Sequence, residues 1–295
     1  IYFGGTVLAM NALRLGAVAQ GLLMWELTGS PLSLGGVAAA TALPMMFVNI
    51  FGGVFADRYE AKLLLGGSAL IGALLFVILG VLDFTDTVRP WHIFSISIFA
   101  GFVSGADQPS RQAYFPSIVP KSAMKSAVTI NGSLMASASV VAPTVGGLLM
   151  AELGTPFGFF IAALGWFAMF AATVVLPRRG TSIVQRSVMR DLGTGIGYIK
   201  SHRVLLVLLI LAFSNMFMVF GWIGMLPAYV ELFGGGKREV GFMFSSAGIG
   251  ALSGIIVAGR LSPGRRLGWM ILGGAASFSS IMLIVSNSPS LALAM

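Results

Sequence analysis

One charged side chain lies well inside a long apolar stretch of the sequence. Arg14 is the only Lys or Arg in residues 3–28, and Asn11 precedes it by about one helical turn. A charge at the centre of a bilayer costs roughly 2.5–3.5 kcal/mol on insertion scales, so this arginine is expected to face the protein interior. Three interpretations stay open: contact with an anionic or polar part of a ligand, pairing with an acid elsewhere in the protein, or extension of the side chain toward the membrane surface.

Polar side chains in two other apolar stretches are candidates for lining the same cavity. The first stretch, 126–151, holds Asn131 together with Thr129, Ser133 and Ser137, and the second, 204–230, holds Ser214 and Asn215. The alternative for each is a hydrogen bond between helices, which is worth about 0.6 kcal/mol in a membrane. We expect that alternative for any single residue, although not for the whole set.

No residue pattern for catalysis or metal binding is found. The sequence lacks a Ser-His-Asp set, a carboxylate pair within an apolar stretch and a glycine-rich phosphate loop followed by Lys-Ser or Lys-Thr. It has no cysteine, and its two histidines, His92 and His202, are far apart. We therefore expect neither an enzyme nor a cofactor or metal site, with a membrane-embedded enzyme as the alternative from a different class.

The amino-acid composition indicates whether the protein surface faces water or lipid. Hydrophobic residues make up 57% of the 295 residues, charged residues only 9%, and the mean hydropathy is +0.93. About a quarter of a soluble domain is charged, so most of this surface must face lipid. The sequence predicts an all-α integral membrane protein of the cell membrane, crossing it many times.

About nine complete membrane-spanning helices and the beginning of a tenth are predicted. A span needs about 20 mostly apolar residues. The expected spans are 3–28, 32–56, 63–82, 91–107, 126–151, 156–176, 204–230, 240–259 and 267–286, with the tenth starting near Ser290. Because the chain begins at Ile1 and stops inside an apolar stretch, we interpret it as a fragment of a longer protein.

The net charge of +8 indicates membrane orientation rather than nucleic-acid binding. If the first span starts in the cytoplasm, fourteen of the eighteen Lys and Arg residues lie on that side, three lie on the other side, and Arg14 lies within a span. Cytoplasmic loops carry such an excess of basic residues. The lipid bilayer and a small molecule are the expected partners, and the protein is expected to act as a monomer.

The longest polar segment divides the chain into two unequal parts. Residues 1–176 hold six spans, 177–203 form a basic linker with apolar residues at helical spacing, and 204–295 hold the remaining spans. Gly35 and Gly53 bracket the second span with the same separation as Gly241 and Gly259 around the eighth. We expect two six-helix halves in parallel repeat, with the second half truncated.

A short motif after the second span resembles a loop of the major facilitator superfamily, G-x-x-x-D-R-x-G-R-K. The matching residues are Gly53, Asp57, Arg58 and Lys62, whereas Glu60 and Ala61 depart from the pattern. The resemblance implies a latch, in which these charges hold the two halves together on the cytoplasmic side of the outward-open protein. Asp107 and Arg111 are one helical turn apart and are expected to join them. The alternative is that the basic residues only set the orientation in the membrane.

Other stretches resemble particular branches of this superfamily. The segment 142–147, with Pro143, Gly146 and Gly147, resembles the G-P-x-x-G-G of its drug and proton antiporters, although close helix packing explains the same residues equally well. Three further stretches, 26–31, 109–120 and 241–254, resemble the branch of enterobactin exporters and macrolide-efflux-like proteins. A complete member has twelve spans, so the resemblance implies that roughly the last three are missing.

The function implied by this resemblance is secondary active transport by alternating access. We expect export of a small amphipathic organic molecule, similar to a drug or a siderophore, and an importer of the facilitator type is the alternative. The acids lie at the ends of the expected spans, so the sequence leaves coupling to protons open.

Overall fold

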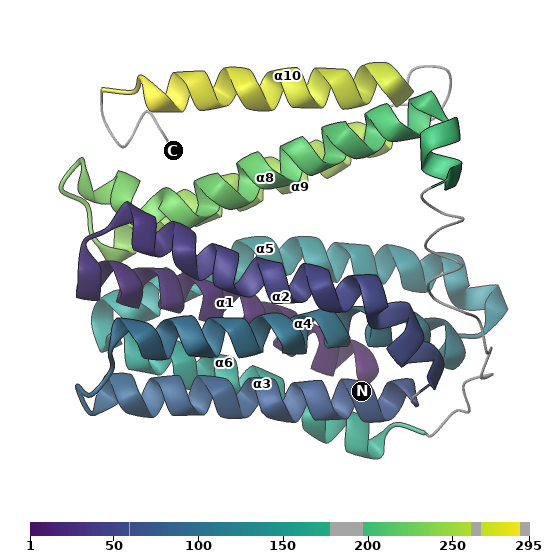
Figure 1. Ribbon diagram of the computed structural model, residues 1–295, viewed down its shortest axis with the longest axis horizontal. Coiled ribbons are helices and arrows are strands. Elements are labelled where there is room, and N and C mark those ends of the chain that lie inside the picture. Colours follow the sequence, from purple (N-terminus) through teal and green to yellow (C-terminus); the bar gives the residue numbers. More distant parts are fainter. Residues whose placement is uncertain (59, 178–196, 261–266, 290–295) are drawn as a thin grey trace.

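The computed structural model describes residues 1–58, 60–177, 197–260 and 267–289, and this part of the chain is helical without a strand (Figure 1). The predicted all-α class is thereby confirmed for the described residues. The long helices are α1 (Tyr2–Thr28), α2 (Pro31–Arg58), α3 (Ala61–Phe84), α4 (Pro90–Ile118), α5 (Met124–Leu153), α6 (Thr155–Val175), α8 (Arg203–Glu231), α9 (Lys237–Arg260) and α10 (Leu267–Ser286). A short 3-10 turn, Lys121–Ala123, precedes α5.

Each range expected to span the membrane is occupied by one of these helices. The largest difference is in α4, which continues to Ile118 instead of ending near residue 107. The expected end was placed at Asp107, where polar residues and prolines begin. Asp107 pairs with Arg111 inside the helix, which accommodates these polar residues, and the helix continues through Pro109 and Pro116. The tenth span and most of the linker, 178–196, lie outside the described residues.

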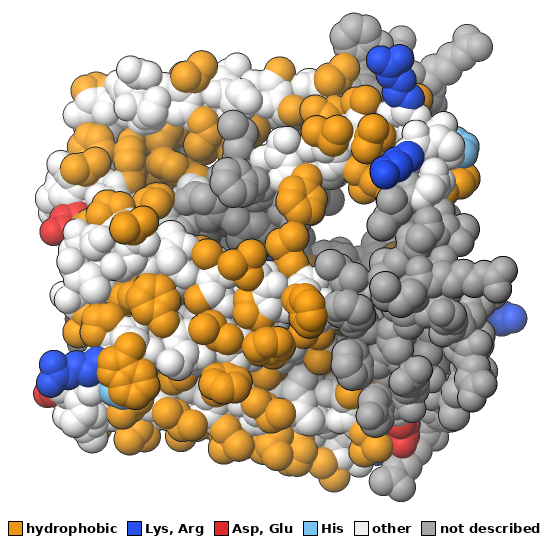
Figure 2. All heavy atoms as spheres, viewed as in Figure 1, with side chains coloured by type: hydrophobic (Ala, Val, Ile, Leu, Met, Phe, Trp, Pro, Cys, Tyr) orange, Lys and Arg blue, Asp and Glu red, His pale blue; other side chains and the backbone are white. Residues whose placement is uncertain are grey.

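Four helices are long and apolar enough to cross a membrane by length and composition among the described residues: α1, residues 31–49 of α2, α3 and α6. In the described part of the face shown in Figure 2, apolar side chains cover the middle and the charged side chains lie at the two ends. This distribution suits a bundle whose helices run across a bilayer. That the remaining helices also cross it stays a prediction.

The connection between α1 and α2 is sharp and follows from two residues. Gly29 has φ 55°, and its N–H donates to the carbonyl of Trp25, which closes the last turn of α1. Pro31 then begins α2, where its missing N–H costs nothing. The chain therefore reverses between α1 and α2 within a few residues.

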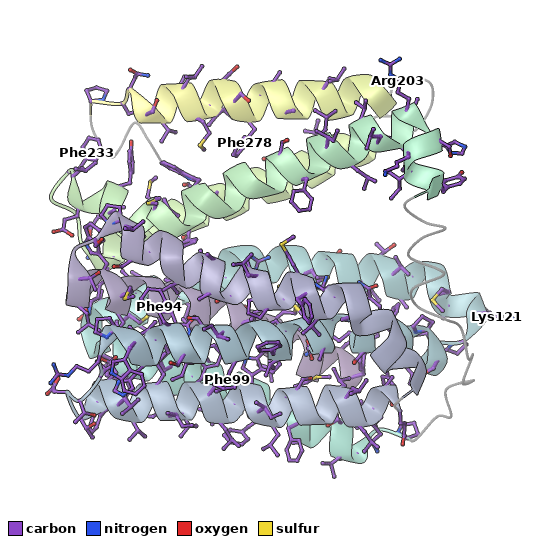
Figure 3. All side chains as sticks on the ribbon, in the orientation of Figure 1. Phe94, Phe99, Lys121, Arg203, Phe233 and Phe278 are labelled. Atoms are coloured by element: carbon purple, nitrogen blue, oxygen red, sulfur yellow. The ribbon has the colours of Figure 1, made fainter. Side chains whose placement is uncertain are left out.

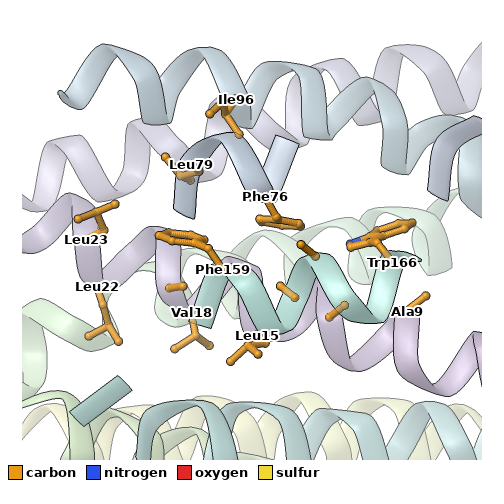
Figure 4. Packing of buried hydrophobic residues seen from close by; sticks show 14 of the residues in the cluster. Ala9, Leu15, Val18, Leu22, Leu23, Phe76, Leu79, Ile96, Phe159 and Trp166 are labelled. Atoms are coloured by element: carbon orange, nitrogen blue, oxygen red, sulfur yellow. The ribbon is translucent and has the colours of Figure 1, made fainter. Parts of the chain in front are cut away.

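The core lies among α1, α3, α4 and α6 (Figure 4). The rings of Phe76 from α3 and Phe159 from α6 stack with centroids 6.4 Å apart, and Trp166 lies further along α6. Small residues of α1, such as Ala9 and Ala19, are fully buried and let the helices approach closely. This packing makes α1–α6 one compact group.

Helix α9 packs closely on α5, whereas α8 meets the group α1–α6 mainly at one end. In Figure 1, α8 starts away from α2 and converges on it toward its C-terminus, where α8 also meets α1. We call the place of convergence the joined end; it is formed by residues 21–38, 143–147 and 224–241. Arg203 at the start of α8 and Lys121 before α5 lie at the opposite end, on different sides of the bundle (Figure 3).

Candidate functional site

Polar contacts between the two groups of helices are found at the joined end. The Nζ atom of Lys237 in α9 lies 2.6 Å from Oε1 of Glu26 in α1, and the indole N–H of Trp25 donates to Oε2 of Glu231 in α8. The Lys237–Glu26 pair is partly exposed, with 26% and 41% of the two side chains accessible. Its own contribution is small, about 0–1 kcal/mol.

The closest contact between the two groups involves a pair of glycines. A Cβ atom at position 147 of α5 would lie 2.4 Å from the Cα of Gly241 in α9. Beside it, a Cβ at Gly146 would lie 2.2 Å from Cδ1 of Leu15 in α1, and the carbonyl of Pro143 also faces Gly241. The three residues of the predicted antiporter-like motif therefore pack α5 against both α1 and α9, as small residues do between membrane helices.

Arg14 lies on the face of α1 that is directed toward α8. It is exposed, and helical periodicity places it on the same face as Gly21 and Trp25. Gly21 is next to Pro227 of α8, and Trp25 binds Glu231. The amide nitrogen of Asn11 donates to the carbonyl of Val7 over 2.7 Å. The donor group of this side chain is therefore engaged within its own helix.

The other predicted cavity residues lie further from the joined end. Asn131 is half-buried on α5, with Nδ2 3.8 Å from Sδ of Met135. It is fifteen residues before Gly146, which contacts α1 at Leu15, so about 22 Å of helix separate Asn131 from the level of Arg14. Ser214 is exposed on α8, and the side chain of Asn215 lies outside the described residues.

Asp107 and Arg111 form a buried network inside α1–α6. The Nε atom of Arg111 lies 2.6 Å from Oδ2 of Asp107, and the side chains are only 7% and 6% exposed. Ser68 of α3 donates to Oδ1 of Asp107 over 3.2 Å, and Nη1 of Arg111 donates to Oγ1 of Thr6 in α1 over 3.3 Å. Nη1 also lies 3.7 Å from Sδ of Met169 in α6, so the network connects four helices.

The described contacts of the other predicted latch residues also stay within α1–α6. Nζ of Lys62 donates to the carbonyl of Leu176 and, over 3.3 Å, to that of Val174, which satisfies the C-terminus of α6. The side chains of Asp57 and Arg58 lie outside the described residues, as does the surrounding of Gly53. No three His, Asp or Glu side chains gather as metal ligands among the described residues.

Sequence reasoning missed the charged and aromatic residues of the joined end. Glu26 and Glu231 were recognised as ends of apolar stretches, and Glu26 also begins the segment 26–31 that carries part of the family resemblance. Lys237 was counted among the basic residues, and Trp25 was not singled out. The only sequence signal for their proximity is the predicted topology, which places them on the same side of the membrane. Which helices are neighbours cannot be read from spacing along the chain, so the pairing comes from the structure.

Comparison with known proteins adds an independent finding. A family model described as a transmembrane secretion effector matches residues 6–295. The enterobactin exporter of Shigella boydii is 26% identical over 244 residues, which are 81% of this chain and 58% of that protein. The staphyloferrin A transporter of Staphylococcus aureus is 25% identical over 227 residues, 76% of this chain and 57% of the relative. The chain thus spans a little under three fifths of the length of these relatives.

Proposed function

Because the chain belongs to the transmembrane secretion effector family of the major facilitator superfamily, we propose that it forms the larger part of a secondary active exporter. The family assignment confirms the resemblance seen in the sequence, and it makes the protein a membrane transporter rather than an enzyme. The relatives are named for the export or transport of siderophores. A siderophore-like, amphipathic organic molecule is the substrate class that we propose.

The observation that carries this proposal is the one-sided contact between α8 and the group α1–α6. The two groups meet through Lys237–Glu26, Trp25–Glu231 and Gly147–Gly241 at the joined end, while α8 diverges from the bundle toward Arg203 (Figure 1). Alternating access requires two groups of helices that close one end while the other end is open. We propose that residues 1–176 and 204–295 are these two units, joined by the linker 177–203.

The orientation of the chain in the membrane decides which state of the transport cycle the structure describes. The basic loops predict that Arg203 and Lys121 lie in the cytoplasm, which places the joined end outside. The described state is then open toward the cytoplasm, where an exporter takes up its substrate. Single cysteines test this orientation: an impermeant thiol reagent should label Thr87→Cys and Gly235→Cys in intact cells and spare Ser182→Cys. The opposite pattern would reverse the assignment.

The cytoplasmic latch is a proposal for the opposite state. When the cytoplasmic ends approach, the loop with Asp57, Arg58 and Lys62 would come close to the second unit. Asp107 and Arg111 would support it from within α1–α6, because their network fixes the cytoplasmic half of α4 against α1, α3 and α6. Several weak pairs can bias two states that differ by only a few kcal/mol.

Efflux from cells tests the proposed function directly. Cells that express the full-length protein should lose a preloaded siderophore-like compound faster than cells with a Gly147→Leu variant, in which the added side chain meets the backbone of Gly241. A proton uncoupler added to the same assay distinguishes a proton-coupled exporter from other driving forces. Accumulation of the compound without efflux would support the importer alternative and overturn the proposed direction.

A further inference from the structure

The position of Arg14 gives the proposed transport pathway a specific chemical character. Other residues of α1 are covered by neighbouring helices: Ala12 is next to Gly165 of α6, and Leu15 is next to Gly146 of α5. The face that carries Arg14 is the one that meets α8 at Gly21, seven residues later. A helix rises 1.5 Å per residue, so Arg14 lies about 10 Å inside the joined end. Its exposed side chain is therefore directed into the space between α1 and α8.

Arg14 has no acidic partner in the part of the chain that the structure describes. Three acids of the surrounding helices are already engaged, since Glu26 pairs with Lys237, Glu231 accepts from Trp25 and Asp107 pairs with Arg111. None of the ten Asp and Glu residues of the chain occurs in 204–230 before Glu231, so α8 offers no counter-ion at the level of Arg14.

Asp57, whose side chain is not described, belongs to the other end of the bundle. It follows Gly35 by 22 residues on α2, and Gly35 approaches Met225 of α8 at the joined end. Asp57 therefore lies about 33 Å along the helix axis from the joined end, whereas Arg14 lies about 10 Å from it. An axial gap of roughly 20 Å is too long for an ion pair.

We infer that Arg14 binds an acidic group of the transported molecule, so that the substrate is an organic anion such as a carboxylate. This inference rests on the proposed transport function and narrows its substrate class. A guanidinium binds a carboxylate through two parallel, charge-assisted hydrogen bonds. An uncompensated cation at this depth is costly, and an anionic ligand removes that cost during each transport cycle.

Asn11 adds a second polar contact on the same face. Its amide nitrogen is held by the carbonyl of Val7, and no donor occupies its Oδ1 among the described residues. This oxygen can accept a hydrogen bond from a hydroxyl or N–H group next to the acid. The ligand chemistry is thus an acidic group with a neighbouring donor. An anionic lipid headgroup carries a related charge, but Arg14 lies about 10 Å inside the joined end rather than at the membrane surface.

Binding of matched acids and amides to the full-length protein tests the inference. The protein is placed in bilayers of phosphatidylcholine, and ligand binding is measured for a panel of aromatic and aliphatic carboxylic acids, each with its primary amide. At least one acid should bind wild-type protein about tenfold more tightly than its amide, which corresponds to about 1.4 kcal/mol. Arg14→Gln should abolish the difference, and Arg14→Lys should keep part of it. Arg203→Gln, which removes an exposed charge at the start of α8, should leave it unchanged.

The outcomes separate this inference from its alternatives. Equal binding of every acid and its amide by wild-type protein would overturn it, as would an acid preference that survives in Arg14→Gln. If Arg14→Gln lowers the amount of folded protein while the remaining protein still prefers acids, Arg14 forms a structural ion pair instead. An acid preference that disappears when phosphatidylglycerol is added would assign the site to lipid. Efflux of a neutral compound by wild-type protein would leave the proposed function intact while the anion inference fails.

Discussion

Removing the charge of Asp107 should destabilise the protein before it affects transport. Asp107→Asn keeps the shape of the side chain and the contact with Ser68, but it leaves the guanidinium of Arg111 without its carboxylate. Both side chains are less than a tenth exposed, and Nη2 of Arg111 already lacks a partner among the described residues. Breaking a buried pair by removing one partner typically costs about 3–5 kcal/mol. We expect thermal unfolding in detergent to begin several degrees lower.

Two further variants make this prediction specific. Asp86→Asn is the matched control, because Asp86 is exposed in the α3–α4 loop and Asn tolerates its φ of 54°; it should change stability by less than about 0.5 kcal/mol. The double variant Asp107→Asn with Arg111→Met removes both charges and should recover most of the loss. If Asp107→Asn is as stable as Asp86→Asn, the network does not hold the four helices together. Normal stability with lost transport would indicate a role confined to the latch.

Changes at two positions of the joined end and at Lys62, at the opposite end of the bundle, test other parts of the account. Lys237→Glu should shift the protein several-fold toward the state with an open outer end, because it removes the pair with Glu26, worth up to about 1 kcal/mol, and adds repulsion between two carboxylates; the added Glu26→Lys should reverse the shift in crosslinking. Gly147→Ala should impair efflux less than Gly147→Leu, since the clash with the backbone grows with the side chain. Lys62→Gln should leave insertion normal and lower stability by less than about 1 kcal/mol, as measured by thermal unfolding, because the lost contacts are partly exposed.

The ranges of the helices could be predicted because they depend on local properties. Short stretches of sequence determine the apolar length of each helix and the reversal at Gly29 and Pro31. They also determine the breaks near Gly154 and Gly234. The end of α4 could not be predicted in the same way. Polar residues usually end a span, but Asp107 and Arg111 neutralise each other inside the bundle, and this depends on Thr6 and Ser68 from distant helices.

The candidate site shows the same division between local and distant information. The unusual position of Arg14 and the small residues around Pro143 were visible in the sequence, because one charge in an apolar stretch and a cluster of glycines are local signals. Their surroundings were not visible. That Gly147 faces Gly241, and that the face of α1 with Arg14 and Trp25 is directed toward α8, follows only once α8 and α9 are placed against α1 and α5.

Paired distance measurements on the full-length protein test alternating access most directly. Spin labels on Lys121→Cys and Arg203→Cys report on the proposed cytoplasmic end (Figure 3). Labels on Thr87→Cys and Gly235→Cys report on the opposite, proposed outer end. Under transport conditions, the account predicts that the first distance shortens in the same population in which the second lengthens. Distances that stay fixed during active transport, or that change in the same direction at both ends, would contradict it.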